Sequence, residues 1–392
     1  LKNYKMKKNN NISIIGGAGH IGLPLGVLLA SKNFNINLID INSKALEKIK
    51  AGNFIYKEDK GKLFLKKALK KKKLSFSTDL SIIKKTDTII LCIGTPINNK
   101  LKPATKNFIN FFKKLNFFIS SDQVIIIRSS VYPGICDKVK KILKTNNIAY
   151  CPERIVQGKS LVEMPNLTQI ISGYTKKSIK DSNEIFKIIS KKTLTTTVKE
   201  AELIKLFSNA YRYIHFSIAN QFYMIAKKNN LDFFKLKENM KDGYNRNSSL
   251  PQPGLTAGPC LLKDTMQLKF YMNNIFELGV SAMNINENLP IFAIRELEKK
   301  ISIKNKTLGI LGMAFKPESD DLRDSLSVKL LNYLKKRKIK TLCSDPYVQN
   351  NNYINEKQLL KRADIIFIGV PHKKYKNIKF PKKEVINVWG KF

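Results

Sequence analysis

The sequence predicts an α/β protein in which two parallel-sheet domains are joined by a helical region with a long central helix. Three observations support this fold class. Apolar strand patterns alternate with helical patterns from the start, beginning with a strand, a glycine-rich turn and a helix in 11–31. Residues 200–228 form one helical pattern without Gly or Pro, and strand–helix alternation returns at Lys306. Strands that alternate with helices are typical of parallel sheets.

The N-terminal part consists of short apolar strands, each followed by a turn or a polar residue. The apolar positions of a lysine-rich stretch, 57–73, recur at helical spacing and predict a helix there. The remaining elements expected in this part are strand 11–15, turn 16–22, helix 23–31, strand 35–39, strand 88–93 and strand 124–127.

The middle of the chain is expected to be all-helical, and the C-terminal part returns to strands and helices. The helices expected in the middle are 200–228, 231–242, 260–276 and 282–300. The C-terminal elements expected are strand 307–311, helix 324–336, strand 340–344 and strand 364–370. The predicted domains are therefore 11–198, 199–304 and 305–392.

Composition indicates a folded protein. The chain has 392 residues, of which 43% are hydrophobic and 9% aromatic, which excludes wholesale disorder. Its formal net charge is +41, but only 8 of its 71 basic residues are the arginines that base and phosphate recognition favours. We interpret the charge as lysine-rich surface composition, with attraction of an anionic substrate and nucleic-acid binding as the alternatives.

The cysteines and histidines give no sign of disulfides or of a metal site. Five cysteines and three histidines are scattered without a CxxC pair or a Cys/His cluster, which favours a reducing, cytoplasmic location. The apolar stretch 12–30 contains five glycines and a proline, so no membrane span is expected. Residues 1–10 are expected to be a polar tail, and the initial Leu suggests a non-standard or truncated start.

The turn after the first strand predicts a dinucleotide site. Gly17, Gly19 and Gly22 form a GxGxxG pattern between a strand and a helix, where Gly17 allows the tight turn, Gly19 lets the backbone approach a pyrophosphate and Gly22 allows close helix packing. Asp40 closes the second strand, where an acidic side chain accepts hydrogen bonds from a ribose 2′-hydroxyl and favours NAD over NADP. His20 and Ile21 fill the variable positions of this loop.

Seven segments, in order, resemble the nucleotide-sugar 6-dehydrogenase family, which contains the UDP-glucose and UDP-N-acetylhexosamine dehydrogenases. They are 17–25 (GAGHIGLPL), 92–96 (CIGTP), 129–134 (SSVYPG), 152–158 (PERIVQG), 200–209 (EAELIKLFSN), 252–264 (QPGLTAGPCLLKD) and 311–325 (LGMAFKPESDDLRDS). The resemblance implies an NAD-binding Rossmann domain, a helical dimerisation region and a Rossmann-like domain for the UDP-sugar. It also implies a homodimer or higher homo-oligomer, a role in polysaccharide biosynthesis, and neither nucleic acid nor a membrane as partner.

The family's chemistry is a four-electron oxidation of a sugar hydroxymethyl group to a carboxylate with two NAD. Cys260 begins a helical pattern, where the helix N-terminus stabilises a thiolate that can capture an aldehyde as a thiohemiacetal. Asp264 lies four residues on, and Lys205 and Asn209 have the same spacing on the long helix. By resemblance, Lys205 and Asn209 stabilise the oxyanion, and Lys205 and Asp264 handle protons and water. The alternatives are an inert buried thiol for Cys260 and a solvated helix face for Lys205.

The remaining site residues come from the resemblance alone. Glu153 is expected to assist thioester hydrolysis, with a salt-bridged structural carboxylate as the alternative, and Ser130 is expected near the catalytic water. Thr95 and Arg323 are expected to contact the cofactor. The expected substrate contacts are Arg246, Gly258, Phe315 and Lys316, with plain surface charge as the alternative for the cations. The family implies no metal.

The substrate itself is left open. The loop before Cys260 is one residue shorter than the family's usual loop and carries Pro259, which lacks a backbone N–H. Lys263 before Asp264 resembles the UDP-glucose branch, whereas the PER triplet at 152–154 resembles the N-acetylhexosamine branch. We expect a UDP-N-acetylhexosamine, either UDP-ManNAc or UDP-GlcNAc, with UDP-glucose second. The residues are also compatible with a catalytically idle nucleotide-binding protein or with a two-electron dehydrogenase.

Overall fold

A computed structural model gives the structure of the protein and describes residues 11–95, 97–98 and 101–390. The chain forms two compact units, Leu1–Phe207 and Ser208–Phe392. The expected polar tail and Pro96 of the CIGTP segment lie outside the described residues. The boundary between the units lies inside the long helix α8 (Val198–Lys228). The three-domain division with boundaries after residues 198 and 304 stays a prediction.

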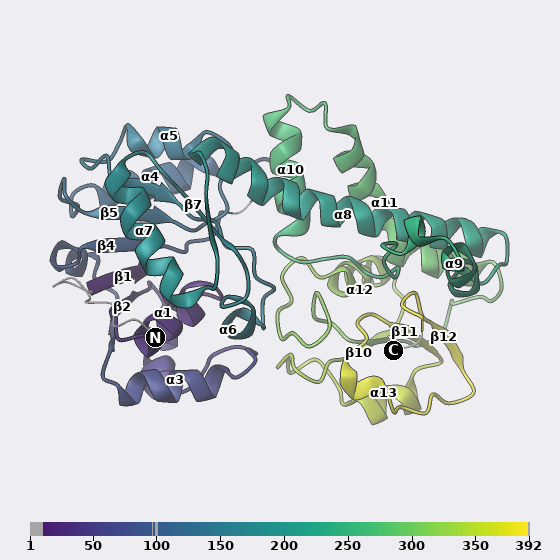
Figure 1. The fold of residues 1–392 in the computed structure, drawn as a ribbon. Coiled ribbons are helices and arrows are strands. Elements are labelled where there is room, and N and C mark those ends of the chain that lie inside the picture. Colours follow the sequence, from purple (N-terminus) through teal and green to yellow (C-terminus); the bar gives the residue numbers. More distant parts are fainter. Residues whose placement is uncertain (1–10, 96, 99–100, 391–392) are drawn as a thin grey trace. The chain divides into compact units, whose positions relative to one another are not determined.

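In the described part of the first unit, eight strands form one sheet in the order β3-β2-β1-β4-β5-β6-β7-β8 (Figure 1). All neighbours are parallel except β6 and β7, which pair antiparallel. The expectation of a parallel sheet is therefore confirmed for most of it and wrong at that one pair. The strands are β1 (Asn11–Ile15), β2 (Asn35–Ile39), β3 (Leu74–Ser77), β4 (Thr88–Leu91), β5 (Val124–Ile127), β6 (Ile148–Tyr150), β7 (Gln169–Gly173) and β8 (Thr193–Thr195).

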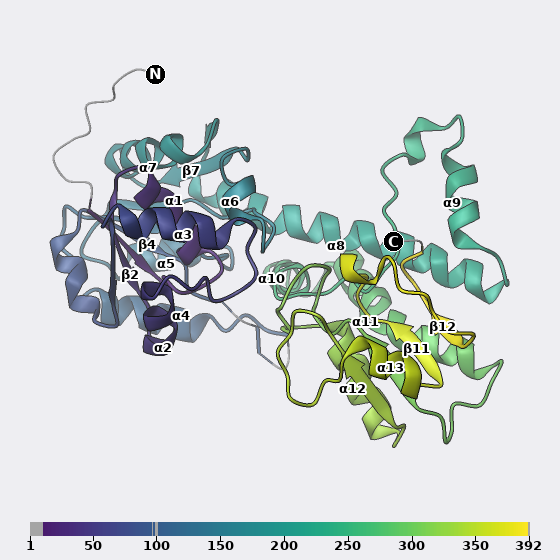
Figure 2. The same ribbon diagram turned by 90° about the horizontal axis from the view of Figure 1, so that it is seen from below.

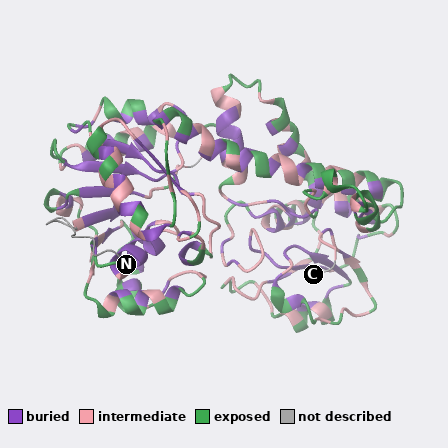
Figure 3. Cartoon of the chain, viewed as in Figure 1, coloured by how far each residue is buried: buried purple, intermediate pink, exposed green. Residues whose placement is uncertain are grey.

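Helices cover both faces of this sheet because its central strands are apolar on both sides. β4 and β5 are buried at every position, and Figure 3 shows these strands as buried. One apolar core lies under α1, α3, α6 and α7, and α1 and α3 lie side by side in Figure 2. The other lies under α4 and α5. The helices are α1 (Gly22–Ser31), α2 (Ser43–Lys50), α3 (Gly61–Lys70), α4 (Thr105–Leu115), α5 (Ile135–Lys140), α6 (Ser160–Glu163) and α7 (Lys176–Ile189), with a 3-10 helix at Leu80–Lys85.

The helix expected at 57–73 is shorter than predicted. α3 begins only at Gly61, because Lys60 has a left-handed φ of 59° that interrupts a right-handed helix. The apolar spacing in this stretch is helical, but it does not show where the backbone turns into the helix. Element ends are set by such local backbone geometry and not by periodicity.

The second unit contains a smaller sheet and the long helices. In its described residues, four parallel strands form the order β10-β9-β11-β12. α11 and α12 pack on one face, and α13 packs on the other (Figure 1). These elements are β9 (Leu308–Leu311), β10 (Thr341–Ser344), β11 (Ile365–Ile368), β12 (Glu384–Ile386), α9 (Phe233–Lys241), α10 (Leu261–Tyr271), α11 (Glu277–Glu298), α12 (Leu326–Lys336) and α13 (Glu356–Arg362), with 3-10 helices at Asn245–Asn247 and Lys373–Tyr375.

The two sheets share one arrangement. Order β2-β1-β4-β5 in the first sheet corresponds to order β10-β9-β11-β12 in the second. In each sheet a glycine with positive φ follows the first strand, Gly16 at 82° and Gly312 at 93°. A Cβ on either glycine would lie within 2.6 Å of the carbonyl oxygen of Cys92 or Val370, which follow β4 and β11. The predicted pair of Rossmann-like sheets is thus confirmed.

Candidate active site

The glycine loop after β1 is shaped by close backbone contacts. The positive φ of the turn falls on Gly16 and not on Gly17, where the glycine pattern placed the tight turn. A Cβ on Gly17 would lie 2.9 Å from Leu38 and Ile39 of β2. A Cβ on Gly22 would lie 2.2 Å from the carbonyl oxygen of Gly16, so Gly22 allows the close approach of α1 that the pattern predicted. Gly19 is less crowded, with a Cβ 3.2 Å from the same oxygen.

Asp40 sits at the end of β2 and is bonded to the glycine loop. Its Oδ2 accepts a hydrogen bond from the backbone N–H of Ala18 at 3.0 Å, and its Oδ1 accepts one from the N–H of Asn42 at 3.0 Å. The side chain of Asn42 in turn caps α2. Asp40 is therefore held beside the loop that would carry the pyrophosphate, which suits hydrogen bonding to an adenosine ribose.

His20 and Ile21, which fill the variable positions of the glycine loop, also have defined surroundings. The ring of His20 packs on the ring of Tyr56 with centroids 4.0 Å apart, and the Tyr56 hydroxyl donates to the carbonyl oxygen of Gly19 at 2.9 Å. Ile21 is the N-cap residue of α1. No sequence pattern indicated Tyr56, because it lies 37 residues from Gly19 in a stretch without a motif.

Thr95 and Ser130 meet at the carboxyl edge of the first sheet. The Thr95 hydroxyl donates a hydrogen bond to the carbonyl oxygen of Ser130. The two residues follow β4 and β5, and neighbouring parallel strands end at the same edge. The structure therefore brings together one residue expected at the cofactor and one expected near the catalytic water.

Glu153 is buried and fully engaged within the first unit. Its Oε2 forms an ion pair with Arg128, and its Oε1 accepts hydrogen bonds from the N–H groups of Arg154 at 2.7 Å and Ile155 at 3.1 Å. This is the salt-bridged arrangement that stood as the alternative to a role in hydrolysis.

Arg128 is a residue of this site that the sequence analysis missed. Besides Glu153, it donates to the carbonyl oxygen of Cys151 at 3.0 Å and to the side chain of Gln169 at 2.9 Å. Its guanidinium lies 4.5 Å from the ring centre of Phe186. Arg128 directly precedes the SSVYPG segment. An Arg that follows a run of apolar strand residues is the sequence feature that could have indicated it.

The polar residues of α8 and α10 meet in part. The side-chain amide of Asn209 donates to Oδ2 of Asp264 at 2.6 Å, and Asp264 is fully buried. Lys205 lies one turn before Asn209 and is only 7% exposed, so the solvated-face alternative for Lys205 is wrong. Among the described residues, no hydrogen bond or ion pair engages its ammonium group. The ammonium itself is not among the fully buried polar atoms, so the alkyl chain of Lys205 is packed while its charged end stays accessible.

Cys260 differs from the other cysteines. It is exposed and is the N-cap residue of α10, as predicted, so the inert buried alternative does not apply. Burial raises the pKa of the Cys92 thiol to about 12, that of Cys151 to about 11 and that of Cys343 to about 12, and it raises the pKa of Cys136 as well. Cys260 is thus the one exposed thiol among the five, and it lies at a helix N-terminus, whereas three of the others are buried by their neighbours.

Two cations accompany Cys260. Burial opposes the charge of Lys263, but the negative charges of Asp264 and the Cys260 thiolate still raise the pKa of its ammonium group. The Lys263 ammonium lies 3.3 Å from Oδ1 of Asp264. Arg323 forms an ion pair with Asp321 at 2.6 Å, which is the main reason that its pKa is raised, and it also interacts electrostatically with Cys260.

Side chains from other parts of the chain contact the loop before Cys260 at two of its glycines. The side chain of Asn220 on α8 both accepts from the N–H of Gly254 at 2.8 Å and donates to its carbonyl oxygen at 3.1 Å. A Cβ on Gly254 would lie 2.3 Å from the ring of Trp389. Gly258 has a φ of 108°, and a Cβ there would lie 2.4 Å from the ring of Phe315. The structure thus brings Gly258 and Phe315 together, as their shared assignment to the substrate requires.

The two remaining residues expected at the substrate are cations. Lys316 lies with its ammonium 5.8 Å from the ring centre of Phe315. Arg246 is exposed in the 3-10 helix Asn245–Asn247, with its guanidinium 5.8 Å from the ring of Tyr244. The substrate roles of these two cations stay predictions.

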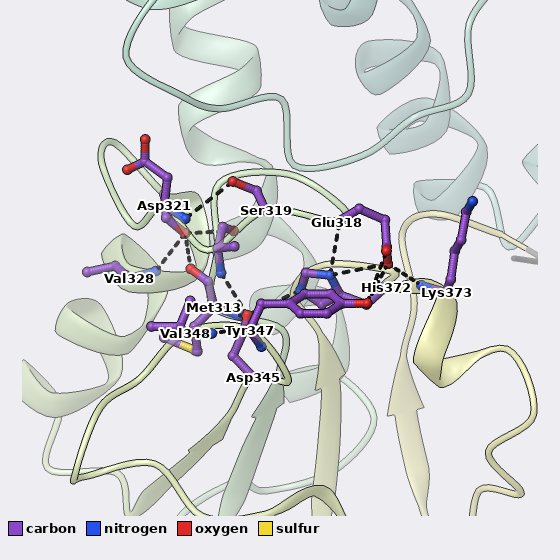
Figure 4. A network of polar contacts seen from close by, with 12 residues as sticks. Met313, Glu318, Ser319, Asp321, Val328, Asp345, Tyr347, Val348, His372 and Lys373 are labelled. Atoms are coloured by element: carbon purple, nitrogen blue, oxygen red, sulfur yellow. Dashed lines mark hydrogen bonds and ion pairs between the residues drawn. The ribbon is translucent and has the colours of Figure 1, made fainter. Parts of the chain in front are cut away.

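A buried polar network supports the loop that carries Phe315 and Lys316 (Figure 4). Asp345, at the end of β10, accepts from the N–H groups of Met313 and Ala314 at 2.7 and 3.0 Å. His372 lies 3.2 Å from the same carboxylate through Nε2, and its Nδ1 accepts from the N–H of Glu318 at 3.0 Å. Asp345 thus holds the loop after β9 as Asp40 holds the loop after β1.

Comparison with known proteins identifies the family. A family model described as the NAD binding domain of the UDP-glucose/GDP-mannose dehydrogenase family matches residues 10–190. The central domain and the UDP binding domain of the same family match residues 199–288 and 309–387. The chain belongs to the UDP-glucose/GDP-mannose dehydrogenase family. It is an NAD-dependent oxidoreductase of nucleotide sugars, as the sequence resemblance implied.

Individual relatives match over nearly the whole chain. The UDP-N-acetyl-D-mannosamine dehydrogenase of Methanocaldococcus jannaschii is 29% identical over 99% of this chain and 92% of its own length. That of Methanococcus vannielii is 28% identical over 97% of this chain and 90% of its own length. The solved structure of the UDP-D-ManNAc dehydrogenase of Pyrococcus horikoshii has a TM-score of 0.86 at 25% identity, over 94% of this chain and 91% of that one. A UDP-glucose dehydrogenase from Pyrobaculum islandicum shares the fold, with a TM-score of 0.89 at 22% identity, over 98% and 95% of the two chains.

The residues of the first unit fit the NAD that this family uses. The glycine loop offers a cradle whose shape depends on the missing Cβ atoms of Gly16, Gly17 and Gly22. Asp40 beside it provides the acceptor for a ribose hydroxyl. Among the described residues, no helix combines the length and the apolar character that crossing a membrane requires.

Proposed function

We propose that this enzyme oxidises C6 of UDP-N-acetyl-D-mannosamine to a carboxylate, with Cys260 as the nucleophile. The observation that carries the proposal is the exposed thiol of Cys260 at the start of α10, one turn before an Asp264 bonded to Asn209. The choice of sugar is supported by the names of the full-length relatives. UDP-GlcNAc and UDP-glucose remain alternative substrates, the latter because Lys263 precedes Asp264.

The first half of the proposed reaction turns the alcohol into an aldehyde. Bound NAD supplies the acceptor for a hydride. The hydroxyl proton of the substrate must leave as the hydride leaves C6, and Lys205 is the proposed group that stabilises the developing oxyanion together with Asn209. The packed alkyl chain of Lys205 and the absence of an ion pair on its ammonium among the described residues support this role, because the cation remains available to a negative oxygen.

The second half of the proposed reaction passes through Cys260. The thiolate adds to the aldehyde carbon, and the carbonyl oxygen takes up a proton, which gives a thiohemiacetal. A second hydride leaves C6 and the hydroxyl proton is released, which gives a thioester. Water then adds, the C–S bond breaks, and the products are a carboxylate, a proton and the free Cys260. The Asp264 carboxylate, held by Asn209 and Lys263, is the proposed group that orients water.

Glu153 and Ser130 are proposed to serve the hydrolysis step. The ion pair with Arg128 and the hydrogen bonds from two backbone N–H groups hold the Glu153 carboxylate in one orientation. Phe315, Gly258, Lys316 and Arg246 are proposed to hold the UDP-sugar, and Thr95 and Arg323 are proposed to contact the cofactor. Use of the uronate in polysaccharide biosynthesis is a further proposal.

The test is NADH formation with UDP-ManNAc, UDP-GlcNAc, UDP-glucose and UDP-galactose. We expect UDP-ManNAc to give the highest kcat/KM and two NADH for each sugar consumed. Cys260→Ser is expected to abolish formation of the uronate, with Cys343→Ser, which changes a buried thiol in the second sheet, as the control.

Three results would contradict this proposal in different ways. One NADH per sugar together with an active Cys260→Ser variant would indicate a two-electron dehydrogenase. Absence of NADH with every sugar would indicate an idle nucleotide-binding protein. A clear preference for another UDP-sugar would leave the chemistry in place and replace the substrate.

We also propose that the enzyme is a homodimer joined along α8. Four large side chains of the second unit are exposed on this helix, namely Tyr211 (66%), Ile218 (39%), Phe222 (41%) and Ile225 (50%). Their spacing of seven, four and three residues places them on one face. A second copy presents the same stripe, so a two-fold contact would bury both. Ile218→Glu with Ile225→Glu should give a monomer in light scattering, and an unchanged mass would contradict this interface.

A further inference from the structure

Glu202 is a buried carboxylate on α8 to which the proposed mechanism assigns no role. Its side chain lies on the second turn of the helix and is 2% exposed. Its Oε2 accepts from the N–H of Gly134 at 2.7 Å, and its Oε1 accepts from the N–H of Cys136 at 3.1 Å. The Cys136 thiol is a further hydrogen-bond partner. Burying a carboxylate is costly unless its lone pairs are satisfied, and here they are satisfied by the last residue of a loop of the first sheet and by the first turn of α5.

The bonded loop is the SSVYPG segment, 129–134, which connects β5 to α5. Ser130 lies at its start, where its carbonyl oxygen accepts the Thr95 hydroxyl. Gly134 lies at its end with a φ of 84°, and a Cβ there would meet nothing within 4 Å. The glycine is therefore needed for the backbone conformation that points the Gly134 N–H at Glu202, and not for space.

Apolar contacts accompany the Glu202 bonds. Val198 and Ala201, on the first turn of α8, belong to the same buried cluster as Val131 and Ile135 of the loop and α5. Apolar packing alone allows a helix to rotate or slide by small amounts, whereas two hydrogen bonds to one carboxylate fix a single rotation. Glu202 therefore sets the rotation of the first turns of α8 on the first unit.

We propose that Glu202 is a positioning residue for Lys205, fixing the start of α8 against the loop that carries Ser130. Lys205 lies three residues after Glu202, so a rotation of the helix at Glu202 moves the Lys205 backbone with it. The proposal rests on the proposed catalytic role of Lys205. A displacement of about 1 Å at a catalytic group can lower the rate by roughly a hundredfold.

The same helix offers a matched control. Glu200 is exposed and engages the start of α8 through the N–H of Thr197 at 2.9 Å and the Thr197 hydroxyl at 2.8 Å. These bonds, together with one from the Thr196 hydroxyl, lower the pKa of Glu200 to about 2. Glu200 stabilises the helix end but makes no bond to the described SSVYPG loop. If the role of Glu202 were purely structural, Glu202→Gln and Glu200→Gln would both lower the Tm and leave kcat nearly unchanged.

The first measurement compares kcat and KM of Glu202→Gln and Glu200→Gln, using the UDP-sugar that the parent enzyme oxidises fastest. Gln keeps the shape of Glu202 but places an N–H₂ group against one of the two backbone donors. We expect kcat of Glu202→Gln to fall about 10- to 100-fold while KM for NAD stays within about twofold. Glu200→Gln should lower the Tm and leave kcat within about twofold.

The second measurement repeats Glu202→Gln in a Lys205→Ala background, with slow NADH formation followed over hours. If Glu202 acts through Lys205, the double variant should be no slower than Lys205→Ala alone, within about twofold. Equal losses in both backgrounds, or a kcat of Glu202→Gln within about threefold of the parent, would overturn the proposal. If Glu202→Gln does not fold, Glu202→Asp decides, and a folded Glu202→Asp with parental kcat overturns it. Full activity of Lys205→Ala would instead refute the role of Lys205 in the proposed function.

Discussion

At the scale of single residues, the chemistry depends on which polar groups are exposed and which are buried. Cys260 is exposed at a helix start, whereas burial raises the pKa of each of the other four thiols. Lys205 differs, because its side chain is packed on α8 while no counterion engages its ammonium among the described residues. Residue type and spacing indicated both residues, and the packing adds that Cys260 is exposed while Cys151 is buried.

Gly258 provides the first prediction at this scale. Gly258→Ala adds a Cβ 2.4 Å from the Phe315 ring at a φ of 108°, so the ring or the loop must shift. We expect KM for the UDP-sugar to rise roughly tenfold, which corresponds to about 1.4 kcal/mol. Initial rates over a range of sugar concentrations measure it.

The control for this change is Gly243→Ala. Gly243 also has a positive φ, 62°, but a Cβ there meets nothing within 4 Å. The Gly243→Ala substitution introduces similar backbone strain in the same unit, but its Cβ does not touch Phe315. An equal rise of KM in both variants would show that strain, and not contact with Phe315, is responsible.

At the scale of elements, loops are held by side chains from other elements. Asn220 of α8 holds the loop before Cys260, Asp345 after β10 holds the loop after β9, and Asp40 after β2 holds the glycine loop. None of these pairs is local in the sequence. The motif segments predicted which loops matter, but not what holds them in place.

Asp345 leads to a prediction about pH. Burial alone would raise the pKa of its carboxyl, yet the hydrogen bond from His372 and the backbone N–H bonds leave that pKa below its ordinary value. A carboxyl whose pKa is lower in the folded state stabilises that state above its unfolded pKa, and this contribution is lost as pH falls. We expect the free energy of unfolding of the second unit to decrease as pH falls below about 5 and through the folded-state pKa of Asp345, which lies below the ordinary aspartate value.

The variant that tests this is Asp345→Asn. It should cost about 3 kcal/mol at neutral pH, because buried N–H groups lose their charged acceptor, and it should flatten the acid dependence. Urea unfolding across the pH range measures both effects, with tryptophan fluorescence of Trp389 as a probe. Parallel pH curves for parent and variant would show that other carboxyl groups determine the acid response.

At the scale of the whole molecule, the net charge of +41 is the dominant feature. Family models for an NAD-binding and a UDP-binding domain match residues 10–190 and 309–387. A large charge of one sign destabilises a compact state through self-repulsion, and salt screens that repulsion. We expect the Tm to rise by a few degrees when ionic strength increases from about 10 mM to about 150 mM.

Thermal unfolding in potassium chloride and in a second salt of equal ionic strength tests this expectation. Equal shifts in both salts indicate screening, whereas a shift in only one indicates specific ion binding. A Tm that falls with salt would contradict self-repulsion as the dominant electrostatic effect.

The sequence by itself determined the features that depend on neighbouring residues. The glycine turn, the long helix α8, the helical start at Cys260 and the parallel strands follow from periodicity, spacing and backbone preference, which act over a few residues. The short strands β6, β7 and β8, and the antiparallel pairing of β6 with β7, carried no such signal.

Only the tertiary structure decided the pairing of buried polar groups. Arg128 with Glu153 spans 25 residues, Asp345 with His372 spans 27, and Glu202 with Cys136 spans 66. Most buried polar groups are hydrogen-bonded, and strand order and helix packing decide which distant residue reaches them. Local sequence therefore predicted candidate residues for the chemistry, and the fold determined which distant residues contact them.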